Sequence, residues 1–178
     1  MGGIIVTLEF DQQGNQTGKI PVVSIVGKSD SGKTTLLEKL LREAKRRGWR
    51  VATVKHDVHG FDMDKPGKDT WRHAQAGADM VVIASPQKIA ILESVPEDQP
   101  LDAVISRIQG VDLIFTEGYK RADKPKIEVF RSEVHKELLC KPEELIAIAS
   151  DVVFDNGVPS YGLDDAAGLC DVIERLYL

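Results

Sequence analysis

Apolar and polar residues follow one another in blocks along this chain, in the pattern typical of proteins with a parallel β-sheet. Residues 21–26 form a continuous apolar run, as expected of a strand that is buried on both faces. After a polar loop, residues 34–47 carry apolar side chains three and four positions apart, which predicts an amphipathic helix. Residues 51–55 predict another strand, so the segment has the size and order of one strand–helix–strand unit.

The rest of the chain predicts further short elements, among them a hairpin. Two apolar segments, 80–84 and 89–93, are separated by Ser-Pro-Gln-Lys, a length that suits a hairpin turn. The other elements expected are helices at 68–77, 101–108 and 164–177 and strands at 111–115, 127–130 and 146–149. Together these elements predict a three-layer α/β fold with a mostly parallel sheet and an antiparallel hairpin.

The first residues of the chain stand apart from this order. Residues 4–10 are apolar enough for a strand, and the polar residues 11–19 predict a loop. We therefore expect residues 1–20 to be an extension or an extra strand, and residues 21–178 to form a single domain.

Composition narrows the classes of function. The 178 residues include 23 Lys and Arg against 28 Asp and Glu, a formal net charge of −5. This balance argues against binding of nucleic acid, and no apolar run reaches the roughly 20 residues of a membrane span. The two cysteines, Cys140 and Cys170, form no CxxC motif, so we expect reduced thiols in a cytoplasmic protein.

The most informative motif is the polar loop between the first predicted strand and helix. Residues 27–34, Gly-Lys-Ser-Asp-Ser-Gly-Lys-Thr, fit the phosphate-loop pattern G-x-x-x-x-G-K-[ST] at every fixed position. Gly27 and Gly32 permit a backbone whose N–H groups turn toward a phosphate, and the helix N-terminus adds positive charge. We expect Lys33 to contact the β- and γ-phosphates and Thr34 to bind Mg²⁺. A serine-capped glycine turn is the alternative, but it leaves the Lys-Thr pair unexplained.

A phosphate loop requires a metal-orienting acid on a neighbouring strand. Glu117 follows the predicted strand at 111–115 and lies at its carboxyl end, where open α/β sheets bind ligands. Asp112 lies at the opposite end of that strand. We therefore predict that Glu117 acts on the Mg²⁺ side of the site, and that Lys33 and Glu117 are its catalytic residues.

A second polar cluster follows the second predicted strand. Lys55, His56 and Asp57 lie at the carboxyl end of this strand, and His59 follows in the polar loop at 56–67. A loop in this position can close over the γ-phosphate, so we predict that these four residues line a nucleotide site. A transition-metal site built on the two histidines and an ordinary solvated loop are the alternatives.

Taken together, these motifs resemble the molybdopterin-guanine dinucleotide biosynthesis protein B (MobB) family. The resemblance extends over residues 21–178 and rests on segments that are more specific than the phosphate loop alone. These are Val54-Lys55-His56-x-x-His59, Asp64-Lys65-Pro66-Gly67-Lys68-Asp69-Thr70, Ala76-Gly77-Ala78, Glu117-Gly118-Tyr119-Lys120 and Ala147-Ile148-Ala149-Ser150-Asp151.

The resemblance implies a P-loop NTPase fold over residues 21–178 and a GTP-binding accessory protein of molybdenum-cofactor maturation. It further implies a homodimer, at most a slow Mg²⁺-dependent GTPase, that assists the guanylyltransferase joining GMP to molybdopterin. Molybdopterin itself is a further candidate ligand. The nucleotide-binding residues expected are Gly27, Asp30, Ser31, Gly32, Lys33, Thr34, Thr35, Lys55, His56, Asp57, His59 and Asp151, with Thr34 and Glu117 as ligands of Mg²⁺.

The choice of GTP over ATP rests on the resemblance, because the guanine-reading tetrad Asn-Lys-x-Asp does not occur in the sequence. Asp151 follows a predicted strand and is the candidate acceptor for the guanine edge; a turn-forming aspartate is the alternative. A small-molecule kinase or ligase and a metallochaperone GTPase remain open as functions. Small kinases usually carry an arginine-rich lid late in the chain, and residues 131–178 contain only Arg131 and Arg175.

Overall fold

The computed structural model describes residues 19–134 and 136–178, which form two compact units. The first unit comprises the described residues up to His56 together with Ile105–Leu178, and the second comprises Asp57–Val104. The range predicted as one domain is therefore divided by an insertion between the second and third strands of the main sheet in chain order. The strand predicted at residues 4–10 lies outside the described residues.

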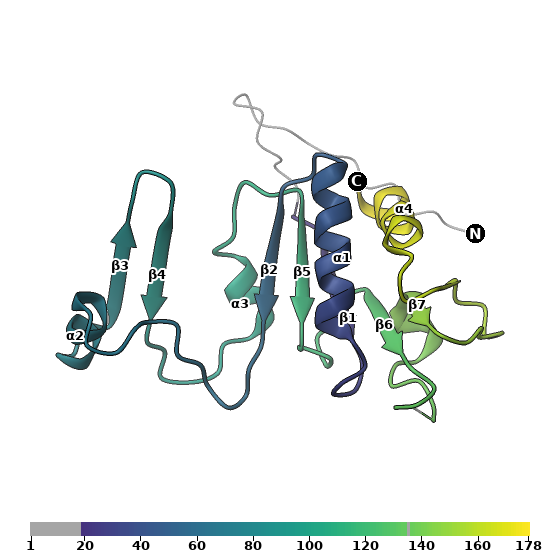
Figure 1. Cartoon of the computed structure of the whole chain (residues 1–178), viewed down its shortest axis with the longest axis horizontal. Coiled ribbons are helices and arrows are strands. Elements are labelled where there is room, and N and C mark those ends of the chain that lie inside the picture. The colour runs from purple at the N-terminus through teal and green to yellow at the C-terminus, as the bar shows by residue number, and fades with distance from the viewer. Residues whose placement is uncertain (1–18, 135) are drawn as a thin grey trace. The chain divides into compact units, whose positions relative to one another are not determined.

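The first unit is built on a six-stranded sheet in which every pair of neighbouring strands is parallel. The strand order is β2-β5-β1-β6-β7-β8, so β1 lies in the interior of the sheet (Figure 1). The mostly parallel α/β fold predicted from the sequence is confirmed. The strands are β1 Val22–Val26, β2 Val51–Lys55, β5 Leu113–Glu117, β6 Lys126–Phe130, β7 Leu145–Ser150 and β8 Ser160–Tyr161.

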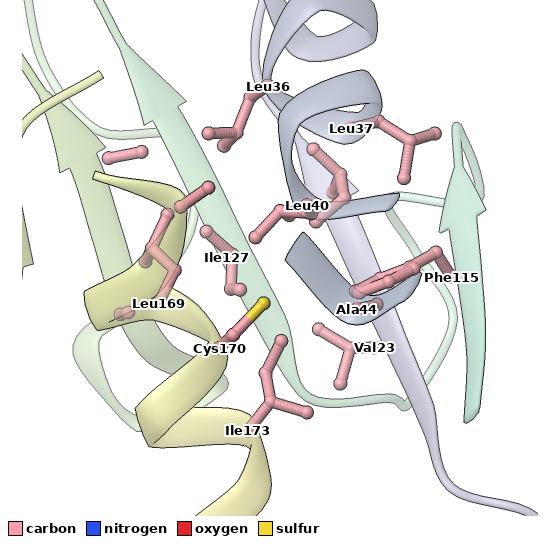
Figure 2. Close-up of a cluster of buried hydrophobic side chains, with 14 of the residues drawn as sticks. Val23, Leu36, Leu37, Leu40, Ala44, Phe115, Ile127, Leu169, Cys170 and Ile173 are labelled. Atoms are coloured by element: carbon pink, nitrogen blue, oxygen red, sulfur yellow. The ribbon is translucent and has the colours of Figure 1, made fainter. Parts of the chain in front are cut away.

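Two helices of the first unit, α1 (Lys33–Arg46) and α4 (Ala166–Tyr177), pack against the sheet and form its main hydrophobic core. The leucines that recur three and four positions apart in α1 all lie on one face, because 3.6 residues make one helical turn. Figure 2 shows this face meeting α4 and the strands. The core side chains labelled there are Val23, Leu36, Leu37, Leu40, Ala44, Phe115, Ile127, Leu169, Cys170 and Ile173.

Polar contacts at the end of α1 join it to α4. Arg47, which follows the last turn of α1, donates to Glu43 in its own helix, with Nε 2.7 Å from Oε1. The same guanidinium contacts Asp171 at 2.6 Å and Glu174 at 2.7 Å, both on α4. The hydrophobic contact between the two helices is thus reinforced by a charged cluster at one end.

The second unit contains a short helix, α2 (Asp69–Gln75), and the predicted hairpin, β3 (Met80–Ala84) and β4 (Ile89–Glu93). A further short helix, α3 (Leu101–Ile105), crosses the boundary between the units. Both hairpin strands have the bounds that the apolar pattern predicts, and they pair with each other alone.

Exposed apolar side chains lie on both faces of the hairpin. On one face Val81 is buried but Ile83 is 54% exposed. On the other face Met80, Val82, Ala84, Ile89 and Ile91 are all exposed. Val82 lies opposite Ile91, and Ala84 opposite Ile89, so these side chains share one face, which we call the open face. The four large side chains of the open face are 51–66% exposed.

The structure departs from the sequence-based elements in a few places. Strand β5 begins and ends two residues later than predicted, so Glu117 is its last residue. The short 3₁₀ helix Pro142–Glu144 and the two-residue strand β8 carry too little periodic pattern to be predicted. Within the described part of the chain, no helix is long and apolar enough to cross a membrane.

Candidate functional site

The candidate site lies at one edge of the six-stranded sheet. Because the strands are parallel, their carboxyl ends meet at this edge, and the loop that leads into α1 lies there in Figure 1. Gly27, His56, Glu117, Arg131 and Asp151 each follow or end one of the strands β1, β2, β5, β6 and β7. The edge therefore gathers side chains that are far apart in the sequence.

The phosphate loop has the backbone that its glycines allow. Gly27 has φ 152° and Gly32 has φ 94°, both in the region that side chains disfavour. A Cβ atom added to Gly27 would lie 2.7 Å from Ser31 Oγ and 2.7 Å from the carbonyl oxygen of Val129. Asp30, at the tip of the loop, also has a positive φ of 60°. The loop is thus tightly curled, and glycine at position 27 is required by both its conformation and its neighbours.

Two polar side chains of the loop, those of Lys33 and Ser31, differ in their contacts. Lys33 Nζ donates to the carbonyl oxygen of Lys28 at 2.6 Å, so the ammonium group is folded back over the loop. Ser31 is fully buried, and its Oγ has no hydrogen-bond partner among the described residues. An unsatisfied buried hydroxyl is costly, and this group is available to donate to a bound anion. No side chain of the described chain caps the N-terminus of α1, which begins in this loop.

Thr34 and Glu117 meet at the mouth of the loop although 83 positions separate them. Thr34 Oγ1 donates to Glu117 Oε1 at 2.9 Å. Both groups offer hard oxygen atoms, which are the ligands that Mg²⁺ prefers. Thr34 and Glu117 would therefore be suitable ligands for Mg²⁺. Thr35 follows in the first turn of α1 and is exposed.

The ends of β2 and β5 are held together by an aromatic stack. The N–H of His56 donates to the carbonyl oxygen of Glu117 at 2.9 Å, and the His56 ring stacks on Tyr119 with centroids 4.5 Å apart. A Cβ atom added to Gly118 would lie 3.0 Å from the Cβ of His56. Tyr119 itself has φ 39°, an uncommon value for a residue with a side chain. This packing fixes the segment that carries Glu117.

The other residues predicted around the nucleotide are not all brought together. Lys55, at the end of β2, is exposed. Asp57 and His59 belong to the second unit, where Asp57 Oδ1 accepts from the N–H of His59 at 3.0 Å. Their part in nucleotide binding stays a prediction. Within residues 19–134 and 136–178, no group of three or more His, Cys, Asp or Glu is placed to hold a metal ion.

Asp151 is engaged by a neighbouring segment. Ser132 donates to its carboxylate twice, from N to Oδ1 at 2.9 Å and from Oγ to Oδ2 at 2.9 Å. The backbone N–H of Ser132 is the main reason that the pKa of Asp151 is lowered from its ordinary value. Guanine recognition by Asp151 stays a prediction, and it would have to use lone pairs that Ser132 leaves available.

Sequence reasoning missed Arg131, which follows β6 at the same edge. Its Nε donates to the carbonyl oxygen of Ser31, inside the phosphate loop, at 3.1 Å. The rule that selected Glu117, a polar residue at the carboxyl end of a buried strand, would also have selected Arg131. It was counted only as one of the two arginines near the end of the chain.

A curled glycine loop between an interior strand and a helix, with a lysine, a threonine and a strand-end acid gathered around it, defines a class of fold. The protein has the P-loop NTPase type of fold. Comparison with known proteins then gives the family. The family described as "Molybdopterin guanine dinucleotide synthesis protein B" (MobB) matches residues 22–151, and this chain belongs to it.

Individual relatives agree over most of the chain. It is 39% identical to the "Molybdopterin-guanine dinucleotide biosynthesis adapter protein" of Haemophilus influenzae, covering 88% of this chain and 89% of the relative. The Escherichia coli protein of the same name is 37% identical, covering 86% and 91%. A crystal structure of "molybdopterin-guanine biosynthesis protein B (mobB)" superposes with a TM-score of 0.69 at 34% identity, covering 88% of this chain and 98% of that one. The resemblance to the MobB family is confirmed.

Proposed function

We propose that this protein is a GTP-binding adapter in the biosynthesis of molybdopterin-guanine dinucleotide. In this proposal it binds GTP with Mg²⁺ at the phosphate loop, hydrolyses it slowly, and assists the guanylyltransferase that joins GMP to molybdopterin. The observation that carries the proposal is the hydrogen bond between Thr34 and Glu117, next to Lys33, in a chain of the MobB family. This hydrogen bond brings the two predicted ligands of Mg²⁺ together beside the phosphate loop.

Binding of the triphosphate is supported by the charge and shape of the loop. Lys33 already contacts a carbonyl oxygen of its own loop, and a phosphate oxygen is a stronger acceptor for the same ammonium group. The buried hydroxyl of Ser31 and the N-terminus of α1 add donors that face an anion. The roles of Gly27, Gly32 and Asp30 in this proposal are to give the loop its curl.

Thr34 and Glu117 would hold the ion, and Mg²⁺ would supply charge neutralisation for the β- and γ-phosphates. The slow hydrolysis that we propose follows from the likeness to the MobB family. We therefore propose that slow GTP hydrolysis controls how long the adapter stays in its GTP-bound form.

A calorimetric titration tests the nucleotide part of the proposal. We expect Mg²⁺-GTP to bind and Lys33→Ala to lose roughly 2–4 kcal/mol of affinity, because a charge-assisted phosphate contact is removed. Glu117→Gln should lower Mg²⁺-dependent hydrolysis more than affinity. The control is Arg175→Ala, which removes one exposed positive charge on α4 and should change neither quantity. Equal binding by wild type and Lys33→Ala would contradict the proposal.

The same titration with ATP and with molybdopterin decides the ligand. A preference for GTP that Asp151→Asn reduces would support guanine recognition by Asp151, and an unaltered GTP-to-ATP ratio would remove Asp151 from that role. Competition between molybdopterin and GTP would show a shared site. Transfer of a phosphoryl group to a small acceptor would favour the kinase alternative instead.

The homodimer is also part of the proposal, and the open face of the hairpin supports it. The open face carries four large apolar side chains that are 51–66% exposed. A second copy of the chain offers the same apolar face, which is the complement that a two-fold interface uses. The open face is therefore the surface on which we expect the copies to meet.

Sedimentation equilibrium tests the homodimer. We expect Ile91→Asp, at the centre of the open face, to shift the protein toward monomer, because a buried unpaired charge is costly. The matched control is Val153→Asp, since Val153 is 91% exposed on the first unit and outside the hairpin. A wild type that is monomeric at all concentrations, or a dimer unchanged by Ile91→Asp, would contradict this part.

The cytoplasmic location that we propose is supported by the thiols. Cys140 and Cys170 are both free, and neither contacts the other in a disulfide. Burial raises the pKa of the Cys170 thiol to about 12 and that of Cys140 to about 11, so both remain protonated. Free, protonated thiols suit a reducing compartment.

A further inference from the structure

Arg131 is the one arginine that reaches the phosphate loop in the described part of the chain. It follows the last residue of β6 and is half-buried. Its Nε donates to the carbonyl oxygen of Ser31 at 3.1 Å. A Cβ atom added to Gly32 would lie 3.5 Å from Nε and 3.6 Å from Nη2 of the same guanidinium. The planar group therefore lies against the peptide that joins Ser31 to Gly32.

The geometry of a peptide bond turns this contact into a constraint on the loop. The structure has no cis peptide bonds among its described residues. In a trans peptide, the carbonyl oxygen and the following N–H point in opposite directions. By holding the oxygen of Ser31, Arg131 turns the N–H of Gly32 away from the guanidinium. The N–H groups of this loop are the donors that a phosphate requires.

The segment that carries Arg131 is itself held in place. The next residue, Ser132, donates from its N–H and its hydroxyl to the two carboxylate oxygens of Asp151, which follows β7. The pKa of Asp151 is lowered mainly by the backbone N–H of Ser132 and that of Asp164 mainly by Lys39, and the positive charge of Arg131 contributes to both shifts. A continuous series of contacts thus runs from the end of β7, through the end of β6, to the phosphate loop.

We propose that Arg131 is a positioning residue for the phosphate loop, holding the Ser31–Gly32 peptide with its N–H directed at the bound phosphate. Asp151 and Ser132 support it by fixing the segment from which it projects. This inference rests on the proposed nucleotide site and adds to it a residue outside the loop. It also gives Asp151 a function that does not depend on the identity of the base.

The test compares Arg131→Ala, Arg131→Lys and the control Arg175→Ala in the full-length protein. We expect Arg131→Ala to weaken binding of Mg²⁺-GTP and of inorganic tripolyphosphate by about tenfold, the effect of one charge-assisted hydrogen bond. Lysine keeps the charge but not a donor at the position of Nε, so Arg131→Lys should recover only a minor part. Ser132→Ala, a milder change, should weaken binding about two- to threefold. Arg175→Ala should leave binding unchanged.

A nucleotide-free measurement reports on the peptide itself. The Gly32 amide signal in ¹⁵N-labelled protein should shift in Arg131→Ala and stay in place in Arg175→Ala. Full recovery of binding by Arg131→Lys would show that only the positive charge of residue 131 affects phosphate binding. Wild-type binding by Arg131→Ala would show that the contact between Arg131 and Ser31 does not contribute to phosphate binding. Either result overturns the inference.

The inference and the proposed function fail in different ways. If Lys33→Ala abolishes binding of tripolyphosphate while Arg131→Ala binds as wild type does, the phosphate site stands and the positioning role falls. If wild type binds neither GTP nor tripolyphosphate, the proposed function falls. The Gly32 amide signal then still decides whether Arg131 holds the peptide, because that measurement needs no ligand.

Discussion

The two β-sheets of this protein differ in how far their apolar side chains are buried. In the six-stranded sheet, the interior strands β1 and β6 are buried at every position, with α1 and α4 packed on one face. In the two-stranded hairpin, both faces carry exposed apolar side chains. The hairpin strands carry an even larger share of apolar residues than the strands of the main sheet, so an apolar sequence alone does not decide which sheet is buried.

The two sheets therefore contribute differently to the stability of the protein. A sheet with helices packed against it removes apolar area from water within one chain, and its folding needs no partner. The hairpin is contacted by the short helix α2 through β3, and the large apolar side chains of its open face stay exposed. The main sheet carries the phosphate loop, whereas the open face of the hairpin is the surface on which we propose that two copies meet.

The largest effect that we predict is the loss of stability caused by a cavity in the core of the main sheet. Leu40 on α1 has no exposed surface and packs in the cluster of Figure 2. Leu40→Ala should lower the free energy of unfolding by about 2–5 kcal/mol, measured by urea denaturation, because a cavity replaces packed atoms. A loss below about 1 kcal/mol in the free energy of unfolding would mean that Leu40 is not tightly packed, and it would contradict the contrast between the two sheets.

A glycine comparison gives the next largest effect. Gly27→Ala forces a Cβ to within 2.7 Å of a backbone carbonyl oxygen that cannot rotate away, so we expect a loss of about 1–3 kcal/mol and weaker phosphate binding. Gly67 in the second unit has φ 83° but nothing within 4 Å, so Gly67→Ala should cost only about 1 kcal/mol. Equal losses would show that crowding at the phosphate loop is unimportant.

The charged cluster between α1 and α4 predicts a pH dependence of stability. Hydrogen bonds from Arg46 and Arg47 lower the pKa of Glu43 from 4.5 to about 2. Glu43 therefore stabilises the folded state fully above about pH 4.5, and this contribution is lost as the pH falls toward 2. Glu43→Gln should flatten the fall in stability across that window, measured by thermal unfolding. An identical acid profile in both proteins would contradict the assignment.

The smallest effect should come from the open face of the hairpin. At protein concentrations too low for dimerisation, Ile91→Ser should change the free energy of unfolding by no more than about 0.5 kcal/mol, because the side chain is already exposed. A loss comparable to that of Leu40→Ala under these conditions would show that the open face is packed within the chain, and the contrast between the sheets would disappear.

Much of the fold followed from local pattern. The bounds of β2, β3 and β4 match the apolar segments, because strands of four to six apolar residues between polar loops leave little ambiguity. Strand β5 is displaced because Val111 and Asp112 lie outside the ladder, where Asp112 instead accepts hydrogen bonds from Arg50. Side-chain pairing decided that boundary, and no periodicity records it.

The residues of the candidate site also form two groups: those that the sequence predicts, and Arg131, which only the structure shows. The glycines, Lys33 and Thr34 are contiguous, so one motif contains them, and Glu117 is found by the rule that ligands lie at the carboxyl ends of parallel strands. Arg131 has no motif, and its importance rests on a contact with a residue 100 positions away. A contact between residues so far apart depends on which strands are neighbours in the sheet. The order of the strands cannot be predicted from the local sequence.

The amino-acid sequence by itself determined the helices and strands, the phosphate-loop motif and the family, because each of these depends on residues close together in the chain or on a pattern shared with relatives. Only the tertiary structure decided that Thr34 meets Glu117, that Arg131 holds Ser31 and that one face of the hairpin stays open. Those features depend on the order and register of strands, which long-range packing and hydrogen bonding select among many locally equivalent arrangements.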